Sequence, residues 1–96
     1  MSPELNAPDP AARPALARGC RLQVRPGAEP LLLVPEGALK LAGPGRDILE
    51  LCDGTRTVDE IVGQLQAQHP ETPAARIAAE VGSFLARLRD RRAVDY

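Results

Sequence analysis

The sequence is poor in the residues that build catalytic and cofactor sites. It contains no tryptophan, one tyrosine, one phenylalanine, one histidine and two cysteines among 96 residues. One histidine and no glycine-rich phosphate loop leave no candidate catalytic residue and no set of metal ligands. We therefore predict no enzyme activity, no metal and no cofactor, and a core of leucine, isoleucine, valine and alanine.

Strong net charge and long apolar runs are also missing. Twelve basic residues stand against 13 acidic ones, which does not give the positive field that drives nucleic-acid binding. The sequence has no run of about 18 apolar residues, which is the length that a membrane helix needs, and its start does not resemble a signal peptide. Cys20 and Cys52 form no Cys-x-x-Cys pattern and are predicted to be small buried hydrophobes. We expect a cytoplasmic protein without nucleic-acid or membrane partners.

The chain divides into a tail and one small domain. Residues 1–18 are rich in proline and poor in large apolar side chains, which predicts a flexible tail. Residues 19–92 form the predicted domain, and residues 93–96 are its C-terminal end. The sequence leaves the oligomeric state open, and a tail that reaches a neighbouring chain would allow an exchanged homodimer.

Three short strands are predicted before the first helix. Leu22 and Val24 alternate with polar residues, the period expected of a half-buried strand. The apolar run 31–34 predicts a second strand, closed by a turn at Pro35-Glu36-Gly37. Leu39 and Leu41 flank Lys40 in a third alternating segment. Together these segments predict a small antiparallel sheet.

Three helices follow, each with its own start and stop signals. The first begins near Pro44 and is predicted to end at Asp53-Gly54. Thr57 and Glu60 have the spacing of a capping box for the second helix, which stops at His69-Pro70. Thr72 as N-cap and Pro73 begin the third helix. Its apolar stripe comprises Ile77, Val81, Phe84, Leu85 and Leu88.

This order of elements predicts an α+β domain, winged-helix-like, with a three-stranded antiparallel sheet followed by three helices that cover one face. A short third strand at the sheet edge exposes unpaired backbone groups. An extended peptide would dock there by strand addition, or tail and turn residues would cover the edge. The pattern alone does not distinguish these two alternatives.

Two blocks of sequence resemble a known family. Leu31-Leu32-Leu33-Val34-Pro35-Glu36-Gly37 is followed at a characteristic separation by Ile48-Leu49-Glu50-Leu51-Cys52-Asp53-Gly54. With the flanking residues, the match spans roughly residues 13–90. The chain is similar to PqqD, the pyrroloquinoline quinone (PQQ) biosynthesis protein D family.

The resemblance implies a peptide-recognition domain that acts as a chaperone. Such a protein would bind the ribosomally made precursor peptide of PQQ and present it to a radical S-adenosylmethionine (SAM) enzyme, which joins a glutamate and a tyrosine of the peptide. The peptide would lie between the third strand and the third helix. The implied lining residues are Ala38, Leu39, Lys40, Leu41, Ile77, Glu80, Val81 and Phe84. Pro35, Glu36, Gly37, Asp53 and Gly54 would shape this groove, and the charges of Lys40 and Glu80 would fix the peptide's register.

Two other classes of function stay open at this point. Helix-turn-helix spacing and the arginines at 87, 89, 91 and 92 fit a winged-helix DNA-binding regulator, although the start of the third helix offers mainly alanines. A quinone-binding protein acting late in the pathway is the other alternative, although few aromatic side chains exist to stack on a ring.

Overall fold

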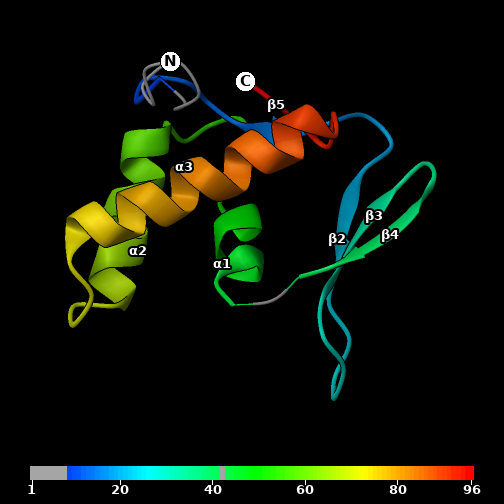
Figure 1. The fold of residues 1–96 in the computed structure, drawn as a ribbon, viewed down its shortest axis with the longest axis horizontal. Coiled ribbons are helices and arrows are strands. Elements are labelled where there is room, and N and C mark those ends of the chain that lie inside the picture. Colours follow the sequence, from blue (N-terminus) through cyan, green and yellow to red (C-terminus); the bar gives the residue numbers. More distant parts are fainter. Residues whose placement is uncertain (1–8, 42) are drawn as a thin grey trace.

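The computed structural model describes residues 9–41 and 43–96. Strands β2 (Arg21–Gln23), β3 (Leu31–Val34) and β4 (Gly37–Lys40) form an antiparallel sheet in the order β2-β3-β4. Helices α1 (Gly45–Glu50), α2 (Val58–Gln68) and α3 (Ala74–Asp90) follow. The sheet stands to one side of the helices, and α3 crosses above α1 (Figure 1). This confirms the predicted α+β fold, in which a three-stranded antiparallel sheet is followed by three helices.

The β3–β4 hairpin has its turn where the sequence predicts it. Val34 pairs with Gly37 across the two-residue turn Pro35-Glu36, and Leu32 pairs with Leu39. The third strand begins at Gly37, two residues before Leu39, because the turn is so tight, and it ends at Lys40, so Leu41 lies just beyond it. In β2, Leu22 is half-buried, but the strand ends before Val24, which is 45% exposed. The expectation that Val24 belongs to the half-buried strand is therefore wrong.

One core joins the sheet to the helices. Leu32 from β3 is completely buried, as are Ile61 from α2 and Leu85 from α3. The predicted stripe of α3 supplies four buried residues, Ile77, Val81, Leu85 and Leu88, whereas Phe84 is only partly buried at its margin. This spacing turns one side of α3 toward the core and leaves the flank that carries Phe84 free to border a surface groove.

The N-terminal segment corrects the expectation of a flexible tail over residues 1–18. Strand β1 (Ala15–Leu16) pairs antiparallel with β5 (Val94–Asp95) in a second, two-stranded sheet. Pro14 is fully buried, and the carbonyl of Ala12 accepts a hydrogen bond of 2.9 Å from the Val58 N–H. Proline suits this segment because it runs extended and satisfies its neighbours' donors with carbonyl groups. The first eight residues of the predicted tail lie outside the described residues.

The predicted caps have different outcomes. The Thr57–Glu60 capping box is present: the Thr57 hydroxyl accepts from the Glu60 N–H, and the Glu60 carboxylate accepts from the Thr57 N–H. Thr72, in contrast, is not the N-cap of α3; Pro73 occupies that position and makes no side-chain cap bond.

Asp53-Gly54 is not the C-terminal cap of α1, which ends at Glu50. Gly54 does take the left-handed conformation (φ +82°), but there its N–H donates to the carbonyl of Pro14 at 3.0 Å. A side chain would be strained at that φ. The glycine therefore fastens the N-terminal segment to the domain.

Candidate peptide-binding groove

A groove with a volume of about 360 Å³ runs between β4 and the C-terminal half of α3. Apolar side chains from both elements form its floor, and basic side chains stand at its rim. The lining residues are Leu39, Lys40, Leu41, Phe84, Arg87, Leu88 and Arg91.

Strand β4 borders this groove with an edge that no other strand covers within the part of the chain that the structure describes. The Leu41 N–H donates to the Pro30 carbonyl at 3.0 Å. Bonded and non-bonded pairs alternate in an antiparallel ladder, so Leu39 also points its backbone groups toward β3. The N–H and C=O of Ala38 and Lys40 then point outward. The edge thus presents donors and acceptors at the spacing an added strand requires.

The helix side of the groove depends on residues three and four apart. Phe84, Arg87, Leu88 and Arg91 follow one another along one face of α3. Opposite them, Gly45 of α1 lies so close to Phe84 that an added Cβ would stand 3.1 Å from the ring. The missing side chain at Gly45 therefore lets the phenylalanine ring lie against the α1 backbone.

Of the described residues that line the groove, three are basic and none is acidic. Lys40, Arg87 and Arg91 are all exposed, so their charges face solvent above the apolar floor. Such a rim attracts carboxylates during encounter and repels cationic segments. The groove can therefore hold an extended chain with apolar and acidic side chains.

The structure brings together only half of the eight predicted lining residues. Leu39, Lys40, Leu41 and Phe84 line the β4–α3 groove. Ala38 lies on the same edge strand, exposed, but outside the lining. Ile77, Glu80 and Val81 line a different pocket nearer the start of α3.

The sequence reasoning missed Arg87, Leu88 and Arg91 as lining residues. Their spacing from Phe84 was the available signal, because positions three, four and seven residues along a helix share a face. The other arginines near this end of α3 have different surroundings. Arg89 lies over the ring of Tyr96, with 4.8 Å between its guanidinium carbon and the ring centroid.

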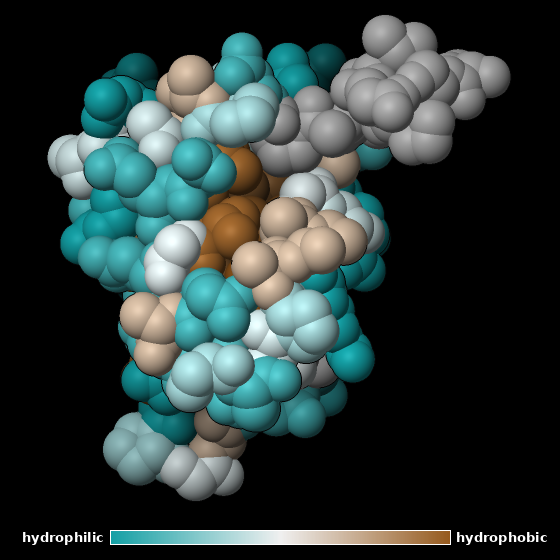
Figure 2. Space-filling view, turned by 90° about the vertical axis from the view of Figure 1, so that its left-hand side faces the viewer, coloured by the Kyte–Doolittle hydropathy of each residue, from teal (hydrophilic) through white to brown (hydrophobic). Residues whose placement is uncertain are grey.

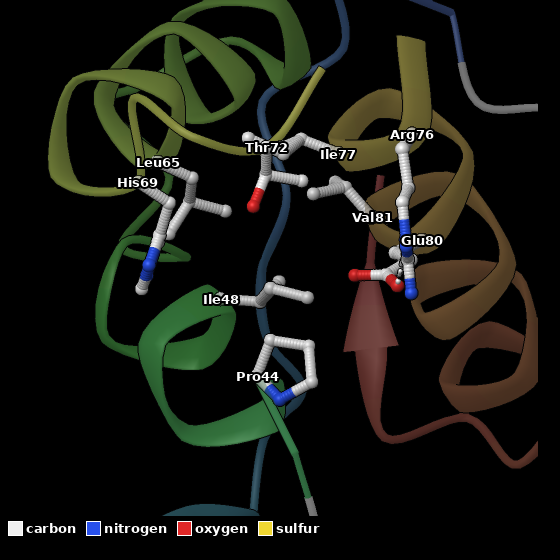
Figure 3. A pocket seen from close by; sticks show the side chains of 9 residues that line it. All are labelled: Pro44, Ile48, Leu65, His69, Thr72, Arg76, Ile77, Glu80 and Val81. Carbon is white, nitrogen blue, oxygen red and sulfur yellow. Dashed lines mark hydrogen bonds and ion pairs between the residues drawn. The ribbon is translucent and has the colours of Figure 1, made fainter. Parts of the chain in front are cut away.

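The second pocket opens among α1, α2 and α3, with a volume of about 280 Å³. Figure 2 shows a strongly hydrophobic patch on the face that carries α2 and the start of α3, with hydrophilic side chains on one side and weakly hydrophobic ones on the other. The side chains converge on this space from all three helices and from Thr72 in the α2–α3 loop (Figure 3). The lining residues are Pro44, Ile48, Leu65, His69, Thr72, Arg76, Ile77, Glu80 and Val81.

The predicted turn and cap residues do not all lie at the groove. Pro35, Glu36 and Gly37 form the hairpin turn that sets the register of β4. Asp53, in contrast, forms a bridge with Ala15 of the N-terminal segment. Hydrogen bonds from Thr55, and to a lesser extent the charge of Arg56, lower the pKa of the Asp53 carboxyl. This corner organises the loop before α2.

The two cysteines are free and differ in environment. Cys52 is buried, as predicted, and its thiol donates to the Ile48 carbonyl at 3.2 Å. Burial, together with the charge of Asp53, raises the pKa of the Cys52 thiol to about 12. Cys20 is only half-buried, which departs from the prediction that both are buried. Neither environment favours a reactive thiolate.

Residues 9–41 and 43–96 contain neither a cluster of metal ligands nor a membrane-spanning helix. No group of three or more histidine, cysteine, aspartate or glutamate side chains there could hold a metal ion. None of the helices in these ranges has the length and apolarity to cross a membrane.

Comparison with known proteins places this geometry in a family. The family model described as coenzyme PQQ synthesis protein D (PqqD) matches residues 29–94. The PqqA binding protein of Stutzerimonas stutzeri is 42% identical over 73 residues, covering 75% of this chain and 77% of its own. That of Azotobacter vinelandii is 38% identical over 79 residues, covering 81% and 84%.

A solved structure is similar over almost the whole chain. It is the solution structure of the PqqD truncation of Methylobacterium extorquens PqqCD, described as a functional, stand-alone recognition element for ribosomally synthesised and post-translationally modified peptides. The identity is 31%, the TM-score is 0.79, and the match covers 97% of this chain and 99% of that one. This chain therefore belongs to the PqqD family of coenzyme PQQ synthesis proteins.

Proposed function

We propose that this protein binds the PQQ precursor peptide PqqA as an added strand along β4 and presents it to a radical SAM enzyme. The observation that carries the proposal is the edge of β4, which no strand among residues 9–41 and 43–96 covers and which borders a groove completed by α3. The names of the relatives as PqqA binding proteins support the identity of the peptide. The protein would act in the cytoplasm, where ribosomes make its ligand.

Backbone and side-chain contacts have separate tasks in this mode of binding. The outward N–H and C=O of Ala38 and Lys40 pair with the peptide backbone whatever its sequence. Selection comes from the groove: alternate peptide side chains meet the apolar floor of Leu39, Phe84 and Leu88. An extended peptide with apolar side chains on one face therefore fits best.

The basic rim adds a preference for acidic peptide segments. Lys40 stands on the strand side, and Arg87 and Arg91 stand on the helix side. Carboxylates on the peptide would meet positive charge from both walls, which speeds association and fixes register. The expectation that Lys40 and Glu80 fix the register stays a prediction, because Glu80 does not line the β4–α3 groove itself but lies along α3 beyond it.

The role ends at binding and presentation. Strand addition restrains the peptide backbone and leaves the flanking segments available to the partner enzyme. The carbon–carbon chemistry that joins the peptide's glutamate and tyrosine then belongs to the radical SAM enzyme.

The test is calorimetric titration of the full chain with synthetic PqqA from Stutzerimonas stutzeri. We expect saturable one-to-one binding, and no binding to duplex DNA or to finished PQQ at the same concentrations. Amide chemical-shift changes at Ala38 and Lys40 would locate the peptide on β4. Binding without shifts on β4 would refute the strand-addition mode, and tight binding of DNA at low salt would favour the regulator alternative.

A further inference from the structure

The pocket among α1, α2 and α3 has an apolar floor but an open mouth. Ile77 and Val81 are 6% and 1% exposed, and together with Ile48 and Leu65 they form a floor of aliphatic carbon. Figure 3 shows Thr72 at the mouth, with its hydroxyl turned toward the middle of the pocket. Arg76 and Glu80 form an exposed ion pair of 3.4 Å on the α3 side. The pocket has the size and lining to accept one large apolar side chain.

This pocket is continuous with the β4–α3 groove. A smaller depression between them, of about 240 Å³, is lined by Pro44, Gly45, Glu80, Ser83, Phe84 and Arg87. Pro44 and Glu80 also line the three-helix pocket, and Phe84 and Arg87 also line the β4–α3 groove. One trough therefore follows α3 past the end of β4 and into the three-helix pocket.

The length of the trough determines how many residues of an extended peptide separate its two ends. Leu88 lines the β4–α3 groove and Ile77 lines the three-helix pocket, eleven residues apart on α3. At 1.5 Å per helical residue the two positions are about 16 Å apart. An extended peptide covers that distance with about five residues.

We propose that the three-helix pocket anchors an apolar side chain of the same bound peptide, about five residues beyond the segment that pairs with β4. This inference rests on the proposed function. The occupant is a leucine-, isoleucine- or phenylalanine-sized side chain, because the floor is aliphatic. Charge differs along the trough, from Lys40, Arg87 and Arg91 at the β4 end to the Arg76–Glu80 pair at the anchor end. Acidic peptide residues therefore belong at the β4 end.

The test places a larger side chain at position 72, which fills the mouth of the pocket and leaves the fold in place. Thr72 is half-buried, and its hydrogen bonds to His69 and Gln66 use only its backbone N–H and C=O. Thr72→Phe fills the mouth, and Thr72→Leu is a smaller plug should the phenylalanine disturb folding. Gln64→Phe adds the same ring to an exposed position of α2 outside the lining and serves as the control.

Each protein is titrated with full PqqA and with PqqA peptides shortened stepwise from either end. We expect one shortening step to weaken binding to the unmodified protein at least tenfold, because it removes the apolar side chain that the pocket buries. The shortened peptide should still change the amide chemical shifts of Ala38 and Lys40. Thr72→Phe should lower the affinity for full PqqA to the affinity that the unmodified protein has for that shortened peptide. Gln64→Phe should leave the affinity for full PqqA unchanged.

Three results would overturn the inference. One is full PqqA binding equally well to Thr72→Phe, Thr72→Leu and the unmodified protein. Another is the absence of shift changes at Thr72 and Ile77 when β4 shifts normally. The third is a plug that weakens the complex with the radical SAM enzyme but not with PqqA, which would assign the pocket to the enzyme. In each case binding on β4 would survive, whereas failure of PqqA to bind at all would refute the proposed function itself.

Discussion

Replacing Lys40 with proline should weaken strand addition without unfolding the domain. Lys40 is exposed, and the alternation fixed by the Leu41-to-Pro30 hydrogen bond turns its N–H away from β3. Proline removes that N–H, and an edge strand tolerates proline where the missing donor faces outward. Leu39→Pro makes the contrast, because Leu39 directs its N–H into the sheet toward Leu32. That variant should lose sheet stability.

The size of the effect follows from one lost backbone bond. The peptide carbonyl that would accept from Lys40 loses its partner within the groove, at a cost of about 1–3 kcal/mol. This corresponds to a weakening of about fivefold to 150-fold in Kd. Lys40→Ala removes the charge but keeps the N–H, so it should cost only about 0.2–1 kcal/mol, as expected of one exposed charge pair.

Calorimetric titration with PqqA measures the three Kd values, and circular dichroism with thermal unfolding checks the fold. We expect the affinity to fall in the order unmodified, Lys40→Ala, Lys40→Pro, with similar spectra for all three. Unchanged affinity in a folded Lys40→Pro protein would show that β4 is not the docking edge, and the reasoning from its free backbone groups would be wrong.

Three further predictions concern the rim, the capping box and the buried thiol. Arg87→Glu reverses a rim charge, so it should weaken PqqA binding several-fold at low salt and less at high salt. Arg25→Glu, in the exposed β2–β3 loop, should leave the affinity unchanged. Equal effects of both variants would point to net charge alone. Thr57→Ala removes the hydroxyl that accepts from the Glu60 N–H, so chemical denaturation should show a loss of about 1 kcal/mol in the free energy of unfolding, and no loss would contradict the capping role. Burial raises the pKa of the Cys52 thiol from 9.0 to about 12. As the pH rises, the thiol therefore loses its proton in the unfolded state before it does so in the folded state. The free energy of unfolding should fall above pH 9, by at most about 1.4 kcal/mol per pH unit. Denaturation between pH 9 and 11 should show a shallower decline in Cys52→Ala, and identical slopes would mean that the thiol does not contribute.

The sequence predicts elements whose signals are local. The capping box needs only Thr57 and Glu60, and the Pro35-Glu36 turn between two apolar runs is enough to indicate the hairpin. The burial of Ile77, Val81, Leu85 and Leu88 follows from helical periodicity alone. These features depend on residues within a few positions of one another.

Features that depend on distant pairing were not predictable in the same way. Ala15 and Leu16 form a strand only because Val94 and Asp95 lie opposite them, and a proline-rich stretch carries no periodic signal of that contact. The lining of the groove is similar: Ile77 and Phe84 both lie on the apolar side of α3, yet periodicity cannot say which of them faces β4. That depends on how α3 crosses the sheet, which is a tertiary property.

The β1–β5 pairing brings the first and last strands of the domain together. Ala15 lies opposite Asp95 and Leu16 opposite Val94, so the first and last strands of the domain lie side by side. A domain with adjacent ends can be fused to another protein at either end, or inserted into it, with little change to its own core. Gene fusions and affinity tags should therefore be compatible with peptide binding, provided the junction leaves residues 14–16 paired with their partners.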